Sequence, residues 1–164
     1  VNSANPSYLN GYVEVAGSRA QVVIANPSGI SCNGCGFINA SRATLTTGTP
    51  LINAGSLTGY VVGGGLIEFL GAGLDTSTAN YTDVISRAVN VNAGIYAQTL
   101  NIATGVGQVN VDADGNHAGI AAAAASTSMP AFSIDVAVRG GLVCGRITLL
   151  GTKVGHGVRH AGNF

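Results

Sequence analysis

The chain has 164 residues, which is enough for one domain, and only 9% of them are charged. Seven basic and seven acidic side chains give a formal net charge of zero, so nothing attracts nucleic acid or an acidic membrane by electrostatics. We therefore expect no nucleic-acid partner, and no apolar run reaches the roughly 20 residues that a membrane-spanning helix needs.

Strand-length runs follow one another from the start of the chain. They are GYVEVAG (11–17), SRAQVVIANPSG (18–29), SRATLTTG (41–48), SLTGYVVGGGLIEFLG (56–71), DVISRAVNVNAGIYAQTLNIATG (83–105), FSIDVAV (132–138) and GRITLLGTKVGHGV (145–158). Apolar and β-branched runs bounded by Gly, Asn, Asp or Pro predict β-strands, so we assign the fold class all-β. The alanine-rich residues 119–126 leave room for one short helix inside an excursion loop at residues 117–132.

Two all-β architectures fit these strands. A sandwich or barrel joins neighbouring strands by hairpins, and Asn-Gly or Asp-Gly at residues 10–11, 33–34 and 114–115 are hairpin signals. A β-solenoid stacks short strands between tight corners, where Asn tolerates the left-handed backbone conformation. Asparagines after apolar residues recur between positions 80 and 101, and the low aromatic content of 5% suits a narrow aliphatic core. The pattern favours the solenoid.

Four segments carry a resemblance to a known family. VVIANPSGISCNGCGFINASRATLTTG (22–48) resembles the signature of the two-partner secretion (TPS) domain. This is the haemagglutination activity domain of filamentous haemagglutinin-like and contact-dependent inhibition exoproteins. Further family segments resemble LNGYVEVAG (9–17), NVNAGIYAQTLNIATG (90–105) and FSIDVAVRGGLVCGRITLLGTKVGHGVRHAG (132–162), in the same order. The resemblance covers nearly the whole chain.

The resemblance implies the fold and the role of the domain. It implies a right-handed parallel β-helix, a single-stranded β-solenoid with extra-helical β-strands, over residues 1–164. By the same resemblance, we expect the domain to lack the N-terminal cap segment with which the family usually begins. Roughly 20 residues per coil would give about eight coils. The implied role is that of a secretion-directing domain of a large exported exoprotein that nucleates β-helix folding, and not that of an enzyme. The alternative is an adhesive, carbohydrate-binding β-helix segment, against which the few aromatic residues argue.

The same resemblance implies the partners. An outer-membrane transporter of the TpsB type would recognise the chain from the periplasm through its polypeptide-transport-associated (POTRA) domains, and strand addition is a general way to bind such β-competent segments. The domain would continue into the rest of its own exoprotein, secreted or displayed by a Gram-negative bacterium. Through the full-length protein, a receptor on a host or neighbouring cell is a further expected partner. We expect no cofactor and no metal ion.

The segment ANPSGI predicts a sharp corner. Pro27 suits the second position of a β-turn begun by Asn26, Gly29 suits the left-handed conformation, and Ile30 would enter the core. The resemblance implies that Asn26, Pro27, Ser28, Gly29 and Ile30 form a secretion motif, whereas the residues alone indicate a fold-forming corner. The Asn26 side chain would bond to the backbone two residues on or to a neighbouring coil. On that basis Asn26→Ala should cost on the order of 1 kcal/mol or more, and Asn26→Asp less.

Cys32 and Cys35 form a C-x-x-C motif directly after this corner. A disulfide suits the oxidising compartment of a secreted protein, and we expect a local stabilisation of about 1–3 kcal/mol. Free thiols are an alternative, and a metal site would need two further ligands. We interpret Cys144 as a buried core thiol.

Catalytic and metal-binding groups are sparse. His156 and His160 would lie on one face of a strand but about 13 Å apart, too far for one metal ion, and we expect all three histidines, including His117, at the surface or at corners. The tight acidic cluster DADG, residues 112–115, lacks the later ligands of a calcium loop and is expected to be a turn. We predict no catalytic residue.

Overall fold

The computed structural model describes Val1 and residues 4–123, 131–151 and 157–162. The regular structure of these residues is entirely β. The strands are β1 (Ser7–Leu9), β2 (Tyr12–Glu14), β3 (Ala20–Ala25), β4 (Ile30–Ile38), β5 (Ala40–Thr46), β6 (Thr49–Asn53), β7 (Ser56–Val62), β8 (Leu66–Thr76), β9 (Tyr81–Ser86), β10 (Ala88–Val91), β11 (Gly94–Thr104), β12 (Gly107–Val111), β13 (His117–Ala122), β14 (Ile134–Val136), β15 (Gly141–Gly151) and β16 (Val158–His160). Within the described ranges, no helix is long and apolar enough to span a membrane.

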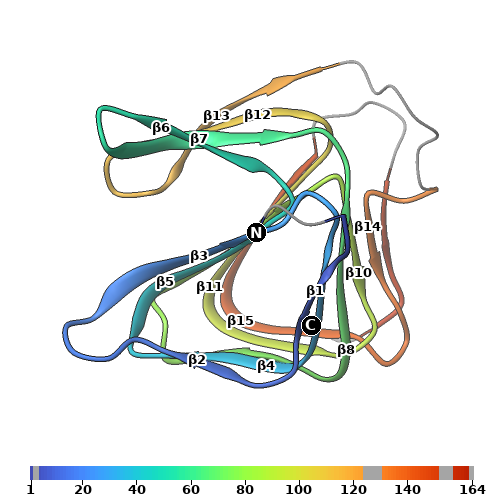
Figure 1. Ribbon diagram of the computed structural model, residues 1–164. Helices are drawn as coiled ribbons and strands as arrows, with labels where there is room; N and C mark the ends of the chain where they lie inside the picture. Colours follow the sequence, from blue (N-terminus) through green and yellow to red (C-terminus); the bar gives the residue numbers. More distant parts are fainter. Residues whose placement is uncertain (2–3, 124–130, 152–156, 163–164) are drawn as a thin grey trace.

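Twelve of these strands form one parallel sheet that winds into a β-helix, seen nearly end-on in Figure 1. On its first face, β1, β4, β8, β10, β14 and β16 stack in that order. Their register places one residue of each strand above the next, in the column Ser7, Ile30, Ile67, Val89, Ile134 and Val158. The predicted solenoid is confirmed, and the sandwich is not formed.

Two further faces complete each coil. The second face consists of β2, the later parts of β4 and β8, and the first parts of β11 and β15. The third face consists of β3, β5, β9 and the later parts of β11 and β15. We call these faces one, two and three. Figure 1 shows them as the three sides of a triangle.

The number of coils is smaller than we expected from the sequence. Face one holds six stacked strands among the described residues, whereas roughly 20 residues per coil had predicted about eight. The reason is that the chain leaves the stack twice, once for β6 and β7 and once for β12 and β13. These excursions use residues that a plain solenoid would place in coils.

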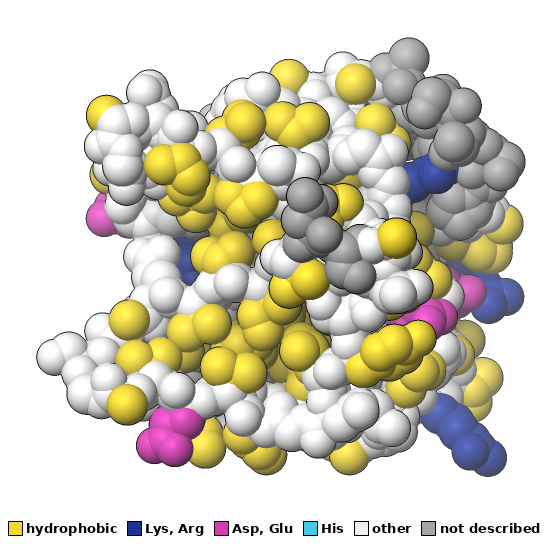
Figure 2. Space-filling model, viewed as in Figure 1, with side chains coloured by type: hydrophobic (Ala, Val, Ile, Leu, Met, Phe, Trp, Pro, Cys, Tyr) yellow, Lys and Arg dark blue, Asp and Glu magenta, His cyan; other side chains and the backbone are white. Residues whose placement is uncertain are grey.

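The core inside the coils consists of inward-facing columns. On face three, for example, Ile24, Leu45, Val84 and Ile102 lie in register, and the last three are fully buried. Phe37 and Phe69 are the aromatic side chains of this buried cluster, which agrees with the narrow aliphatic core that the composition predicted. Figure 2 shows hydrophobic side chains gathered over the end of the stack that holds β1, β2 and β3.

The two excursions pair with each other to form an extra-helical sheet. Its strand order is β13-β12-β7-β6, and all neighbours are antiparallel. It packs on the outside of face three through a second apolar cluster, which contains Tyr60, Val62, Ile85, Ala103 and Val109. The resemblance had implied such extra-helical strands.

Local signals were correct in some places and wrong in others. Asp114-Gly115 lies in the turn between the antiparallel strands β12 and β13, as its hairpin signal predicted. Asn10-Gly11 joins β1 and β2, which both pair with β4 in parallel, and Asn33-Gly34 lies inside β4. The short helix expected at 119–126 is not formed at residues 119–122, which belong to β13, because pairing with β12 outweighs alanine propensity there. Residues 124–126 lie outside the described ranges.

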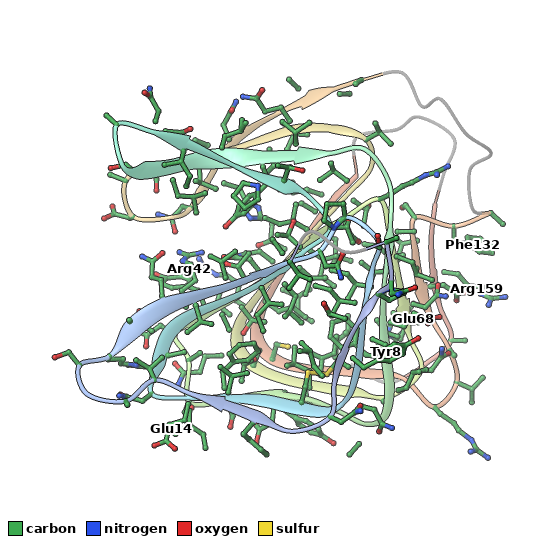
Figure 3. All side chains as sticks on the ribbon, viewed as in Figure 1. Tyr8, Glu14, Arg42, Glu68, Phe132 and Arg159 are labelled. Atoms are coloured by element: carbon green, nitrogen blue, oxygen red, sulfur yellow. A yellow bond between two sulfur atoms is a disulfide. The ribbon has the colours of Figure 1, made fainter. Side chains whose placement is uncertain are left out.

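A buried ion pair lies between face three and the extra-helical sheet. Arg42 Nη1 donates a 2.6 Å hydrogen bond to Asp83 Oδ2, and the two side chains are 5% and 2% exposed. Asp83 also accepts hydrogen bonds from Thr44 and, at 2.8 Å, from Asn101. In Figure 3 Arg42 points into the space below the extra-helical sheet. This pairing between successive coils was not predicted from the sequence.

Removing one partner of this ion pair should destabilise the folded domain strongly. We expect Asp83→Ala to lower the free energy of unfolding by about 3–5 kcal/mol, because it leaves the Arg42 charge buried and uncompensated. The double change Arg42→Met with Asp83→Leu should cost much less. Urea unfolding measures both. The matched control is Asp135→Ala, whose partner Arg159 is 54% exposed; it should cost at most about 1 kcal/mol. Equal losses for the two alanine variants would contradict the prediction.

Candidate functional site

The corner at residues 26–30 joins β3 to β4. The Gly29 amide donates a 3.0 Å hydrogen bond to the Asn26 carbonyl, which closes a β-turn. Gly29 adopts a φ of 119°, so it takes the positive φ that the sequence predicted for this glycine. Ile30 is 1% exposed and enters the core, as predicted. The turn thus redirects the chain from face three to face one.

Every polar group of the Asn26 side chain is engaged by the fold. Its Nδ2 donates to the Asn5 carbonyl at 3.0 Å and to Ser7 Oγ at 2.9 Å, and its Oδ1 accepts from the Ser28 amide at 3.0 Å. Its own amide donates to the Thr46 carbonyl. The two modes expected for the side chain, a local bond and a bond to a neighbouring coil, therefore occur together. Asn26 is 0% exposed.

The corner is also packed against the next coil. A Cβ on Gly65, which has a φ of 81°, would lie 2.7 Å from the Pro27 carbonyl oxygen and 2.7 Å from Thr47. A Cβ on Gly29 would lie 3.0 Å from the Leu66 carbonyl oxygen. Glycines on both sides therefore let two successive corners approach closely. Of the predicted motif, Pro27 is exposed and Ser28 half-buried, while the other members are buried.

The predicted disulfide between Cys32 and Cys35 is present. Both residues belong to the buried core, at 0% and 3% exposure. The bond spans an irregularity in β4, where the register to β8 shifts between Asn33 and Cys35 and Gly34 has a φ of 70°. Because its two residues are three positions apart in the chain, the disulfide stabilises this bend locally and does not join two coils.

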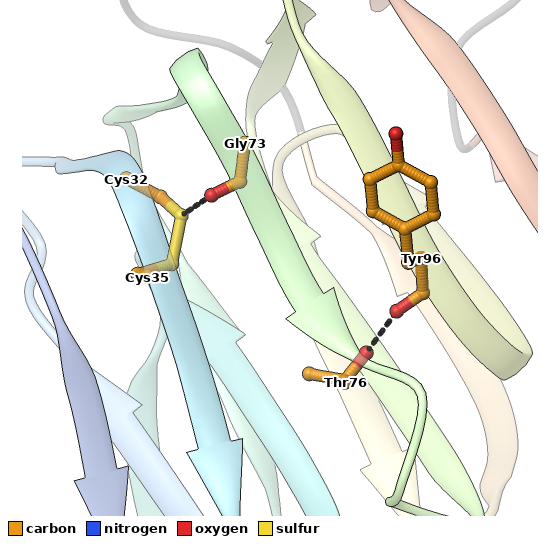
Figure 4. Close-up of a disulfide and its surroundings, with 5 residues drawn as sticks. All are labelled: Cys32, Cys35, Gly73, Thr76 and Tyr96. Carbon is orange, nitrogen blue, oxygen red and sulfur yellow. Dashed lines mark hydrogen bonds between the residues drawn. A yellow bond between two sulfur atoms is a disulfide. The ribbon is translucent and has the colours of Figure 1, made fainter.

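The bend in β4 lies against a glycine-rich bend in β8. The Asn33 side-chain oxygen occupies the space where a Gly71 Cβ would be, only 2.0 Å from it. Cys32 Sγ lies 3.1 Å from the Gly73 carbonyl oxygen (Figure 4). Since a disulfide sulfur carries no proton, we describe this as a close contact. The same view shows Thr76 donating to the Tyr96 carbonyl in the following coil at 3.0 Å.

Cys144 is the free cysteine of the described residues. It is half-buried, packs against the core from β15, and lies next to Ala97 in the register. Burial raises the pKa of its thiol, so it is a poor nucleophile at neutral pH. The interpretation as a core thiol is correct in position, although its burial is only partial.

The histidines and carboxylates do not converge on one site. His117, which was expected at the surface or at a corner, directly follows the turn at residues 112–116, but its side chain is only 8% exposed and lies beside Asp83. His160 lies in β16 and is half-buried, and His156 lies outside the described residues. Asp112 closes the predicted DADG turn by accepting the Asn116 and Asp114 amides, and these bonds lower its pKa. No group of three or more metal-ligating side chains occurs in the described ranges.

On the outer surface of face one, polar side chains of successive coils contact one another. Glu68 accepts from Asn90 at 3.4 Å, and Arg159 makes a two-pronged contact to Asp135 at 2.8 and 2.6 Å. Arg159 also lies over the Phe132 ring, and Figure 3 shows Glu68 and Arg159 along the outer side of this face. These contacts run along the stack, from one coil to the next.

The fold is that of a parallel β-helix with an extra-helical sheet, and comparison with known proteins shows which family of such folds the chain resembles. The family model of the TPS secretion domain matches residues 1–164. Toxin CdiA of Yersinia pestis is 56% identical over 100% of this chain, and the tRNA nuclease CdiA-2 of Burkholderia pseudomallei (strain 1026b) is 46% identical over 100% of it. The chain spans 5% of the length of each relative.

A solved structure shows the same likeness. The crystal structure of the filamentous hemagglutinin secretion domain matches with a TM-score of 0.84 at 33% identity, over 96% of this chain and 54% of that one. The chain belongs to the TPS secretion domain family. It is therefore a secretion-directing domain of exported exoproteins of the CdiA and filamentous haemagglutinin type, as the resemblance implied, and the carbohydrate-binding alternative is not favoured.

The contacts of Asn26 reverse the order of stability that the sequence predicted for its two substitutions, Asn26→Ala and Asn26→Asp. Asn26→Ala removes the acceptor of the Ser28 amide and the donor to Asn5, which should cost about 1–3 kcal/mol. Asn26→Asp keeps the acceptor but buries a charge against the Asn5 carbonyl oxygen, so we now expect a larger loss of about 3 kcal/mol or more. Urea unfolding at neutral pH measures the order. An Asp variant more stable than the Ala variant would contradict it.

The disulfide makes a separate prediction. The native chain without reductant should weigh two hydrogens less than the reduced chain, and only denaturation should make Cys144 react quickly with an alkylating reagent. Replacing both Cys32 and Cys35 by Ala should cost about 1–3 kcal/mol. Mass analysis and urea unfolding provide the measurements. Rapid alkylation of all three thiols in the native, untreated protein would show that the bond does not form in solution.

Proposed function

We propose that this domain directs export by being read in an unfolded form, and that residues 26–30 promote export by building the fold that the chain adopts afterwards. The observation that carries this proposal is the complete engagement of Asn26, whose side-chain donors and acceptor bond to three other residues while the side chain is fully buried. A transporter cannot contact a side chain in this state. Its recognition would therefore precede folding or use other residues.

The partner in this proposal is an outer-membrane transporter of the TpsB type that meets the chain in the periplasm through POTRA domains. Strand addition would suit the recognition step, because the unfolded chain consists of short, weakly charged, β-competent segments. The absence of net charge argues against recognition by long-range electrostatic attraction. No particular segment has to be folded for such pairing.

Folding after transit is the second half of the proposal. The Asn26 corner connects residues 5–7 of the first coil with the turn between β3 and β4, and β3 in turn pairs with β5. Each coil in a solenoid is stabilised mainly by its neighbours. Early coils that hold together through this corner would provide the edge on which the following coils form, and their folding outside the cell would oppose backward movement of the chain.

We further propose that the domain continues into a larger exoprotein and is itself without catalytic activity. The relatives are about twenty times longer, since the chain spans 5% of each. The carboxylates of this domain that carry strong contacts are committed to structure: Asp83 to Arg42, Asp135 to Arg159, and Asp75 to Ser77. Any nuclease or receptor-binding activity of the whole protein would then depend on other parts of it.

The experiment compares export with stability in matched corner variants. Asn26→Ala is paired with Asn39→Gly, because Asn39 also holds a corner through two side-chain bonds, to the Val15 and Gly17 carbonyls at 2.8 Å each. Asn39 has a φ of 59°, which glycine adopts without strain. Export with the cognate transporter and urea unfolding of the purified domains are measured for both.

We expect the two variants to lie on one curve of export against free energy of unfolding, because both corners act through the fold. Export of Asn26→Ala well below that of an equally unstable Asn39→Gly would show direct reading of Asn26. That result would refute the role assigned to residues 26–30 and would leave the secretion-directing role of the domain intact.

A further inference from the structure

The extra-helical sheet is attached to face three by two kinds of contact. Along most of its length the contact is apolar and small, through the cluster around Tyr60 and Val109. At the beginning of β13 the contact is polar and involves His117, Asp83 and Arg42. Far more apolar side chains hold the coils of the β-helix to one another. The sheet is therefore the part of the fold that depends most on this polar contact.

His117 occupies an unusual position in this contact. Its side chain is 8% exposed, and its Nε2 lies 3.8 Å from Asp83 Oδ1, too far for a hydrogen bond. Nε2 is buried and has no hydrogen-bond partner among the described residues. The Asp83 carboxylate is already occupied, since Arg42 and Thr44 donate to Oδ2 and Asn101 donates to Oδ1.

Among the buried side chains of this cluster, the charges balance only while the imidazole is neutral. Asp83 contributes one negative charge and Arg42 one positive charge. The Arg42 guanidinium is also held by a hydrogen bond to Asn116 and by the Tyr81 ring, whose centroid lies 4.4 Å away. Asp112, in the exposed turn before β13, also interacts with Arg42.

Two further ionisable side chains lie near His117. From β15, Arg146 lines the same groove as His117. From β7, Tyr60 stays uncharged because burial raises its pKa to about 12. A proton on His117 would add a second buried positive charge against one carboxylate.

We propose that His117 is an acid-sensitive clamp: a neutral imidazole packs beside Asp83 and lets β13 and the extra-helical sheet dock on face three, and its protonation loosens that sheet while the coils stay stacked. The loosened state is favoured by acid because the imidazolium regains water only when β13 moves away from Asp83 and Arg42. The apolar contacts of the sheet oppose this movement, and they are few.

The direction of the pH dependence follows from the burial of the ring. Burial lowers the pKa of His117, Asp83 opposes this effect, and Arg42 adds to it. An exposed histidine titrates near pH 6.5, so the docked state binds fewer protons than the undocked state below that pH. The stabilisation by His117 is therefore complete above about pH 6.5 and decreases as the pH falls, by at most about tenfold in the docking equilibrium per pH unit.

Hydrogen exchange of the intact domain between pH 7.5 and pH 5 tests the clamp. Exchange is expressed as protection factors, so that the intrinsic pH dependence of amide exchange is removed. We expect protection in β6, β7, β12 and β13 to fall with acid by up to about tenfold per pH unit, while protection in β4, β8 and β11 stays constant. His117→Gln, which is neutral at every pH, should remove this difference. His160→Gln in β16 is the matched control and should retain it.

The wild-type protein supplies a second measurement that does not depend on how the variants fold. Titration of the His117 ring protons by NMR should give a pKa below the ordinary value of about 6.5. A pKa at or above that value would overturn the proposal, because acid would then strengthen the contact to Asp83. Equal loss of protection in the extra-helical sheet and in the coils would overturn it as well, as would an unchanged pH dependence in His117→Gln.

Discussion

The constraint on which the whole structure depends is register between successive coils. Each inward position of one strand lies directly above the same position of the next, so a single column such as Ile30, Ile67, Val89 and Ile134 has to be apolar throughout. A slip of one residue would turn every side chain of a strand to the opposite face. Corners obey the same constraint, because they stack as closely as the strands. The contact of Gly65 with the Pro27 carbonyl shows that a side chain at one corner would displace the corner above it.

Two local devices set the bends that this register requires, and they act differently. At the corner before β4, Asn26 bonds both within its own turn and to the preceding coil, so it fixes the bend and the stacking together. At the bend inside β4, the Cys32–Cys35 disulfide fixes only its own loop, and stacking comes from the close approach of Asn33 to Gly71. A disulfide confined to neighbouring residues adds no long-range cross-link, which agrees with the proposal that the domain is exported before it folds.

The sequence predicted the features that depend on local pattern. Alternation and turn residues indicated all-β structure, the asparagine and glycine corners favoured a solenoid, and C-x-x-C indicated a disulfide. Long-range features were missed, since spacing along the chain cannot reveal that Arg42, Asp83 and His117, from three different strands, meet in space. For that reason the sequence did not show that the His117 side chain is buried beside Asp83. The coil number failed because the first excursion, β6 and β7, carried no signal that separated it from coil strands. The second excursion was indicated only by the Asp114-Gly115 hairpin signal and the excursion loop expected at residues 117–132, and there β13 overrode the helical tendency of its alanines by pairing with β12.

The extra-helical sheet depends on coils that are far apart in the chain. Its first excursion, β6 and β7, leaves the stack after β5, but β7 finds its second neighbour only when β12 arrives after β11. The polar cluster beneath it draws Thr44 from β5, Asp83 from β9 and Asn101 from β11, which are neighbours in register on the outside of face three. With β9 slipped by one residue relative to β5, an apolar side chain such as Val84 would take the place of Asp83, and the Arg42 charge would remain uncompensated. The sheet can therefore dock well only on coils that have stacked in the correct register.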